Sequence, residues 1–286
     1  MRNKKDFHLE NPTWCPGCGL YAIFDALKSA TVSLELDPEE LVMVTGIGCH
    51  GRLNNYFNAY GFHGLHGRVL PVATGIKLSN PELYLIGVSG DGDAYSIGIS
   101  HLIHALKRNI SLTYIIVNNQ IFALTQGQTS PTSSVGFVSK SSPYGSKENP
   151  LDGPRLALAA GGTFIARGFS GEPSHLASLI IKGMNHKGFS FIDVLSPCIT
   201  QNKVNTYSWI RRNIYRLDED SGFSPKDKKQ AWERISDQSK IPVGLIYEEE
   251  KASFEELILS DKEKPIVDSD LKIDSAKFEK ILELFK

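Results

Sequence analysis

The chain has 286 residues, of which 41% are hydrophobic, so it is long enough to bury a large core. Thirty-one basic and 32 acidic residues give a formal charge of −1, which excludes a bulk electrostatic attraction to nucleic acid or to an anionic membrane. The first ten residues are polar and no later apolar run is long enough to cross a bilayer, so we expect a cytoplasmic protein. In a reducing compartment, four cysteines indicate metal or redox chemistry more than disulfides.

Apolar periodicity predicts strands that alternate with helices. Expected helices follow Gly19, span 96–107 and begin at a Ser174 cap, and expected strands cover 41–45, 83–88, 112–117, 163–166 and 189–195. Fully apolar strands in this alternation predict an α/β domain, residues 1–200, with a parallel sheet covered by helices on both faces. The loop 125–150 is rich in Ser, Thr, Gly and Pro and is longer than a connector needs, which favours a binding loop. Residues 201–286 alternate charged and apolar patches and predict a C-terminal helical extension.

Unusual residues follow the ends of four expected strands. They are Gly46-Ile47-Gly48-Cys49-His50, Gly90-Asp91-Gly92-Asp93, Asn118-Asn119 and Pro197-Cys198. Because the carboxyl ends of parallel strands line one crevice, we expect these four segments to meet at a single site.

The first segment formally matches a dinucleotide-binding fingerprint, Gly46-x-Gly48-x-x-Gly51. That fingerprint also needs an acidic residue about twenty positions later to hold a ribose, and no Asp or Glu occurs from Leu41 to Pro81. The same stretch carries basic side chains suited to a polyanion such as a diphosphate: His50, Arg52, His63, His66, Arg68 and Lys77. For any one of these histidines, capping a turn or satisfying a buried carbonyl is the better explanation, but for the group it is less so.

Asp91 and Asn119 lie 28 residues apart, each at the end of an expected strand, with an expected helix between them. Mg²⁺ prefers oxygen ligands and takes only a few of them from protein, so one carboxylate, one amide and one backbone carbonyl would suit it. The pattern resembles the Gly-Asp-Gly and Asn-Asn motif of thiamine diphosphate enzymes. The resemblance implies that Asp91, Asn119 and the Ile121 carbonyl bind Mg²⁺.

Cys15 and Cys18 form a Cys-Pro-Gly-Cys pair, but no strand precedes it as a thioredoxin-like site would require. Cys49 and Cys198 are isolated, whereas structural zinc is usually held by paired cysteines. Four thiolates can also hold a 4Fe-4S cluster without fixed spacing, so the cysteines alone leave zinc and iron open.

Five motifs together resemble the β subunit of 2-oxoacid:ferredoxin oxidoreductases over residues 10–200. These motifs are Trp14-Cys15-Pro16-Gly17-Cys18-Gly19, Gly46-Ile47-Gly48-Cys49, His63-Gly64-Leu65-His66-Gly67-Arg68, Gly90-Asp91-Gly92-Asp93 and Ser196-Pro197-Cys198. The resemblance implies that Cys15, Cys18, Cys49 and Cys198 hold one 4Fe-4S cluster. It also implies a set of residues that line thiamine diphosphate, namely Ile47, Gly48, Cys49, His50, His66, Gly67, Gly92, Asp93, Ala123 and Leu124.

The same resemblance implies the reaction, in which a 2-oxoacid (2-oxoglutarate, pyruvate or both) and coenzyme A give acyl-CoA and CO₂. Electrons would pass through the cluster to ferredoxin, and an α subunit would supply the glutamate that activates the cofactor, so the chain alone would be inactive. His50 and Arg52 are the candidate catalytic residues, and Arg52 could pair with the distal carboxylate of 2-oxoglutarate, although a surface role is equally compatible with the sequence. Gln126 stands where family members often have Lys, which weakens inference about the substrate. The alternatives are a non-redox thiamine diphosphate enzyme and a zinc-stabilised binding module.

Overall fold

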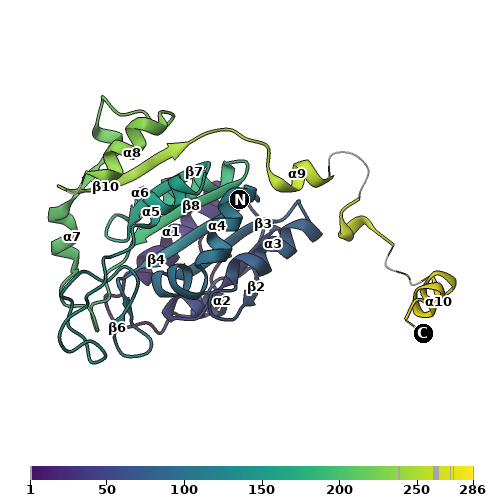
Figure 1. The fold of residues 1–286 in the computed structure, drawn as a ribbon, viewed down its shortest axis with the longest axis horizontal. Helices are drawn as coiled ribbons and strands as arrows, with labels where there is room; N and C mark the ends of the chain where they lie inside the picture. The colour runs from purple at the N-terminus through teal and green to yellow at the C-terminus, as the bar shows by residue number, and fades with distance from the viewer. Residues whose placement is uncertain (1, 238, 260–263, 271, 273, 286) are drawn as a thin grey trace.

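A computed structural model describes residues 2–237, 239–259, 264–270, 272 and 274–285, so part of the expected extension 201–286 lies outside the described residues. Within that part, eight strands form one sheet in the order β2-β1-β3-β4-β8-β7-β10-β9. All neighbouring pairs are parallel except β7 and β10. The expectation of an α/β fold built on a parallel sheet is confirmed (Figure 1).

The strands of the sheet are β1 (Leu41–Thr45), β2 (Tyr60–His63), β3 (Tyr84–Gly90), β4 (Leu112–Asn118), β7 (Phe164–Phe169), β8 (Phe189–Leu195), β9 (Ile214–Arg216) and β10 (Ile241–Glu248). A separate two-stranded hairpin consists of β5 (Ile121–Phe122) and β6 (Gln128–Thr129). The α-helices are α1 (Leu20–Ser33), α2 (Leu53–Tyr56), α3 (Val69–Ser79), α4 (Ile99–Arg108), α5 (Gly153–Ala159), α6 (Pro173–Asn185), α7 (Tyr207–Asn213), α8 (Lys228–Ser236), α9 (Phe254–Leu259) and α10 (Ser275–Glu283). Short helical turns are η1 (Pro38–Glu40), η2 (Cys49–Arg52), η3 (Asp93–Ile97), η4 (Leu217–Glu219) and η5 (Ile266–Asp268).

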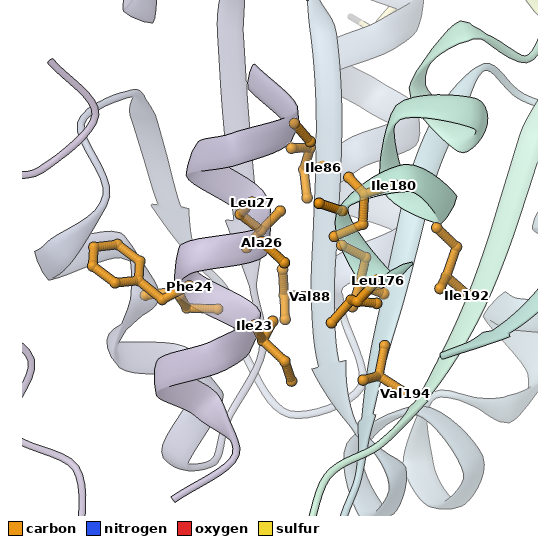
Figure 2. Close-up of a cluster of buried hydrophobic side chains, with 14 of the residues drawn as sticks. Ile23, Phe24, Ala26, Leu27, Ile86, Val88, Leu176, Ile180, Ile192 and Val194 are labelled. Atoms are coloured by element: carbon orange, nitrogen blue, oxygen red, sulfur yellow. The ribbon is translucent and has the colours of Figure 1, made fainter. Parts of the chain in front are cut away.

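The central strands β4 and β8 are buried at every position, so the sheet is covered on both faces, which is typical of parallel sheets. On one face, Ile115 and Val117 of β4 pack with α1 and α6, and Figure 2 shows the side chains of these helices meeting the strands. On the other face, Tyr114 and Ile116 pack with residues of α3, α4, α5 and α8. This double cover makes the sheet a rigid base for the loops at its edge.

Two expected helix starts differ from the structure. The helix expected over 96–107 begins with the π-helical turn η3 and continues as α4, because Gly98 separates the two. Ser174 does not cap α6, because the helix begins one residue earlier at Pro173, with Glu172 as the N-cap residue. Proline is favoured at the first helical position since its missing N–H has no partner to lose there.

The segment after Gln201 contains helices, as expected, and also two strands that the sequence analysis did not foresee. β10 pairs antiparallel with β7, and β9 pairs with β10, so this segment extends the main sheet. Figure 1 shows α9 and α10 leading away from the sheet towards the C-terminus. No helix in the described part of the chain combines the length and apolar character needed to cross a membrane.

Candidate functional site

The four segments expected to converge do meet. β1, β3, β4 and β8 are neighbours in the sheet and run parallel, so the residues that follow them lie at one edge. They surround a cavity of about 370 Å³. Its lining includes residues from all four segments and from the cysteine loop, among them Cys15, Cys18, Ile47, Gly48, Cys49, His50, Arg52, His66, Asp91, Gly92, Asp93, Asn119, Ile121, Ala123, Leu124 and Cys198.

Asp93 lines the cavity and connects it to the segments that follow β1 and β2. Its buried carboxylate accepts hydrogen bonds from the Gly67 N–H at 2.7 Å and from the Ser89 hydroxyl at 2.7 Å, and it contacts His66 Nδ1. Gly46 lies against the same carboxylate, since a Cβ there would stand 1.9 Å from Asp93 Oδ2. Only glycine fits this position. Gly46, which formally matches a dinucleotide-binding fingerprint, is therefore required in this chain by its contact with Asp93.

His50 is buried and uncharged at neutral pH. Burial lowers its pKa to about 4, against the opposing effect of the nearby Asp93 carboxylate. His50 Nε2 accepts the Gly90 N–H at 3.1 Å, which leaves the ring proton on Nδ1. Of the donors and basic side chains expected to suit a polyanion, His50 therefore remains a donor through Nδ1 but adds no positive charge, because burial disfavours the imidazolium.

Asp91 is the other buried carboxylate, with 1% of its surface exposed. Burial raises its pKa to about 6, although hydrogen bonds from Ser130 and Thr132 act in the opposite direction. Both hydroxyls donate to Oδ2, at 2.5 and 2.6 Å. Among the described residues, no ion pair with Lys, Arg or His forms on this carboxylate. A buried carboxylate without a paired cation is suited to bind a metal ion.

Asn119 and Ile121 lie at the same edge as Asp91 and line the cavity with it. Asn119 Oδ1 accepts the Ile121 N–H at 3.1 Å, which closes a short turn after β4. This turn fixes the Asn119 side chain against the backbone of Ile121, in the cavity wall that both share with Asp91. The donor set of one carboxylate, one amide oxygen and one carbonyl fits Mg²⁺.

The four cysteines are free thiols that line the cavity, and, in addition to burial, the proximity of Cys15, Cys49 and Cys198 raises the pKa of Cys18 electrostatically. Gly17 has φ +79°, a left-handed conformation that lets the Cys15–Cys18 turn close on itself, with the Cys18 N–H bonded to the Cys15 carbonyl at 3.0 Å. Burial raises the pKa of Cys18 to about 11 and also raises that of Cys49, so both hold protons that a metal would displace. Among the described residues, no three His, Cys, Asp or Glu side chains converge closely enough to hold a single metal ion.

Arg52 stands at the mouth of the cavity, where its Nη1 donates to Thr13 Oγ1 at 2.8 Å. Thr13 in turn contacts the Tyr56 hydroxyl at 2.8 Å. Ile47 and Leu124 also line the cavity, and their apolar side chains are 41% and 55% exposed. The cavity lining therefore reaches the surface at the Arg52 guanidinium and at apolar side chains.

Some residues of the expected basic group do not reach the cavity. Lys77 is buried at the opposite end of β3, where its Nζ donates to the Leu83 carbonyl at 3.0 Å. His63 and Arg68 also lie outside the lining. Conversely, nothing in the sequence indicated Phe122, which packs against Gly92, or the hydroxyls of Ser130 and Thr132. These two hydroxyls lie in the loop expected to bind, but its Ser and Thr density could not single them out.

The fold and the site define the class of thiamine pyrophosphate enzymes. Residues 46–194 match the family described as thiamine pyrophosphate enzyme, C-terminal TPP-binding domain, which is about half of the chain. Residues 198–262 match the C-terminal part of the pyruvate ferredoxin oxidoreductase beta subunit.

Comparison with curated relatives identifies one family within this class. The 2-oxoacid:ferredoxin oxidoreductase subunit beta of Saccharolobus solfataricus is 38% identical over 280 residues, covering 93% of this chain and 91% of the relative. The 2-oxoglutarate synthase subunit KorB of Methanocaldococcus jannaschii is 38% identical, covering 85% and 90%. A solved 2-oxoglutarate:ferredoxin oxidoreductase from Magnetococcus marinus, with 2-oxoglutarate, coenzyme A and succinyl-CoA bound, matches with TM-score 0.90 and 33% identity over 100% of this chain and 96% of its own. The chain belongs to the family of 2-oxoacid:ferredoxin oxidoreductase beta subunits.

Proposed function

We propose that this chain, with an α subunit, catalyses the oxidative decarboxylation of a 2-oxoacid with coenzyme A to acyl-CoA and CO₂, and passes the electrons to ferredoxin. The observation that carries the proposal is the single cavity at the strand ends, which brings a metal-competent carboxylate and four free thiols together. The names of the relatives, and the 2-oxoglutarate and coenzyme A bound in the solved neighbour, support the substrate class.

Thiamine diphosphate and Mg²⁺ fit the oxygen-rich part of the cavity. Asp91, Asn119 and the Ile121 carbonyl would hold the metal, and through it the diphosphate. The walls around His50 and Asp93 would line the cofactor, and Gly67, which lies outside the cavity lining, would hold Asp93 through its N–H. When bound, thiamine diphosphate supplies the carbanion chemistry that cleaves the bond to the carboxylate. The protein itself binds and orients the cofactor. It also keeps the ring proton of His50 on Nδ1, because Nε2 accepts a hydrogen bond from the Gly90 N–H.

A 4Fe-4S cluster fits the sulfur-rich part of the cavity. Four thiolates are the usual ligands of such a cluster, and its size separates them further than a single ion would. Cys198 Sγ already accepts the Gln201 N–H at 3.5 Å, the type of hydrogen bond that tunes a cluster's potential. Cys49 follows directly on Gly48 of the cofactor wall, so a cluster held there would be adjacent to the reacting centre.

An α subunit is part of the proposal because the site is incomplete in this chain. Among the described residues that line the cavity there is no glutamate, the residue that the family uses to activate the cofactor. Ile47 and Leu124 expose apolar surface at the mouth, where a partner could cover them. We also propose that residues 1–200 carry all the ligands and that 201–286 form an extension. A cytoplasmic location suits four free cysteines.

For the substrate we propose that Arg52 pairs with the distal carboxylate of 2-oxoglutarate, since a guanidinium at the cavity mouth can bind a carboxylate through two hydrogen bonds. Arg52→Ala should raise the KM for 2-oxoglutarate far more than that for pyruvate. Thr13→Val, which removes the hydroxyl that Arg52 and Tyr56 share but keeps the guanidinium, is the matched control. An unchanged ratio of 2-oxoglutarate to pyruvate turnover in Arg52→Ala would disprove this role.

The whole proposal is tested by producing the chain with its α subunit without oxygen. Visible and electron paramagnetic resonance spectra should show a reducible cluster, with bound iron and thiamine diphosphate and with 2-oxoacid-dependent reduction of ferredoxin. Thiamine diphosphate without iron would indicate a non-redox thiamine enzyme, and zinc without iron a zinc-stabilised module. Full activity of this chain without the α subunit would contradict the requirement for a partner.

A further inference from the structure

The loop after β6 places a compact turn, Ser130-Pro131-Thr132-Ser133, directly behind the Asp91 carboxylate. The hydroxyl-bearing residues of this turn are buried, with exposures of 8% for Ser130, 3% for Thr132 and 1% for Ser133. The turn is closed by its own hydrogen bonds, from the Ser133 N–H to the Ser130 carbonyl at 3.0 Å and from the Ser130 N–H to Ser133 Oγ at 2.8 Å. It is therefore a defined element within the long loop.

The turn contacts both segments that carry the proposed metal ligands. On one side, Ser130 and Thr132 donate to Asp91 Oδ2. On the other side, the Ser133 hydroxyl donates to the Gln120 carbonyl at 2.7 Å. Gln120 stands between Asn119 and Ile121 and has the uncommon φ of +59°. One turn thus links the carboxylate after β3 to the two ligand positions after β4.

Each hydroxyl has a single proton, and counting these protons shows which bonds they form. Ser133 gives its proton to the Gln120 carbonyl, and Ser130 gives its own to Asp91. Thr132 lies 2.6 Å from Asp91 Oδ2 and 3.1 Å from Asn118 Oδ1, so these two oxygens compete for one proton. The ionised carboxylate is the stronger acceptor and is closer, so the proton points to Asp91.

Two donors on the same oxygen fix the rotation of a carboxylate about its terminal bond. The two hydroxyls occupy Oδ2 of Asp91. Oδ1 is then held in one orientation and stays available to bind a cation. Mg²⁺ demands near-ideal octahedral geometry and tolerates little misplacement of a ligand, whereas Ca²⁺ accepts irregular geometry. Hydrogen-bonded partners of metal ligands typically affect metal affinity by roughly 10–100-fold.

From these contacts we propose that the turn Ser130–Ser133 is the positioning element of the metal site, with Ser130 and Thr132 orienting Asp91 and Ser133 fixing the segment that carries Asn119 and Ile121. This inference rests on the proposed function, because it takes Asp91, Asn119 and Ile121 as the Mg²⁺ ligands. None of the three turn residues touches the metal or the cofactor in this account. They act through the ligands.

The test is Mg²⁺-dependent cofactor binding by the complex with its α subunit, after removal of metal and thiamine diphosphate. Mg²⁺ is titrated at fixed thiamine diphosphate, and binding is followed by tryptophan fluorescence, to which Trp14 in the cavity wall contributes. Thr132→Val and Ser130→Ala should each raise the half-saturating Mg²⁺ concentration about 10–100-fold. Thr132→Ser keeps the hydroxyl and should bind like the unmodified protein. Ser141→Ala, an exposed hydroxyl of the same loop, is the matched control.

A second readout separates positioning from general loss of structure. If geometry is what the variants lose, Ca²⁺ should support cofactor binding nearly as well in Thr132→Val as in the unmodified complex, so the ratio of Mg²⁺ to Ca²⁺ affinity falls. A variant that only weakens the fold lowers both affinities together and lowers the thermal midpoint without metal, which would overturn the positioning role. Unchanged Mg²⁺ affinity in both Thr132→Val and Ser130→Ala would also overturn it. Cofactor binding by the unmodified complex without any dependence on Mg²⁺ would instead refute the metal site itself, and the positioning role with it.

Discussion

Replacing Asp91 by asparagine should stabilise the cofactor-free protein while it abolishes Mg²⁺-dependent cofactor binding. In the folded chain burial raises the Asp91 pKa from 3.8 to about 6. For a raised pKa, the stabilising effect of protonation is fully present below pH 3.8 and is lost as the pH rises through about 6. A difference of about 2 pKa units corresponds to about 3 kcal/mol, so above pH 6 the buried charge lowers the free energy of unfolding by about that amount.

Asparagine is neutral at all these pH values, and its amide oxygen can take the place of Oδ2 and keep the hydrogen bonds from Ser130 and Thr132. Those bonds become weaker without the negative charge, so we expect a net gain of about 1–3 kcal/mol at pH 8. This corresponds to a rise in Tm of about 2–10 °C for a chain of this size.

The assay is thermal unfolding of the complex in EDTA, without thiamine diphosphate, at pH 8 and at pH 5. Asp91→Asn should be more stable than the unmodified protein at pH 8, and its advantage should shrink at pH 5, where the unmodified carboxyl is largely protonated. Addition of Mg²⁺ and thiamine diphosphate should reverse the order, because only the unmodified protein gains from binding. A variant that is no more stable at pH 8 than the unmodified protein would refute the reasoning.

Two other substitutions test the cavity wall. Gly46→Ala should destabilise the fold by about 1–3 kcal/mol and weaken thiamine diphosphate binding, because the new Cβ would overlap the hydrogen-bonded Asp93 carboxylate; thermal unfolding and fluorescence titration measure both effects. The His50 pKa is lowered from 6.5 to about 4, so the stability it contributes is present above pH 6.5 and is lost as the pH falls towards 4, a loss of about 3 kcal/mol. His50→Gln keeps an acceptor for the Gly90 N–H, and urea unfolding at pH 7 and pH 4.5 should show a smaller acid destabilisation in this variant.

The convergence of the site was predictable because it depends on one rule. Once the strands ending at Thr45, Gly90, Asn118 and Leu195 belong to the same parallel sheet, their following residues must share an edge. Apolar runs identify such strands, and helical periodicity identifies the connections that make them parallel. Once the strands are known to be parallel neighbours, the sequence alone predicts that the motifs following them lie close together.

Features that depend on distant partners were not predictable. β10 carries Pro242 and Gly244, which weaken a strand pattern, and it is a strand because its apolar residues pair with β7, more than seventy residues earlier. The role of Thr132 depends on its contact with Asp91 across 41 residues, and sequence density in Ser and Thr says nothing about which hydroxyl faces the carboxylate. Lys77 was placed with the site because it is close in sequence, but α3 carries it to the far end of β3.

Several basic residues that were expected at the site add no positive charge to the cavity, and this changes the expected electrostatics of cofactor binding. Arg68 and Lys77 lie outside the cavity, His50 is uncharged and Arg52 is exposed, so the buried acidic side chains in the cavity wall, among the described residues, are Asp91 and Asp93. A diphosphate brought to such a wall meets like charge. Unit charges roughly 5 Å apart repel by about 3 kcal/mol at an effective dielectric constant of 20, which corresponds to about 100-fold in affinity. The cavity should therefore accept the diphosphate only together with a divalent cation.

Removal of metal tests this coupling. In EDTA the affinity of the complex for thiamine diphosphate should fall by about 100-fold or more, and the loss should be smaller for thiamine, which carries no diphosphate. Isothermal titration with both compounds, with and without Mg²⁺, measures the four affinities on one preparation. Equal affinity for thiamine diphosphate with and without Mg²⁺ would mean that other cationic groups, such as the exposed Arg52 of the cavity lining or residues of the α subunit, neutralise the diphosphate in place of the metal.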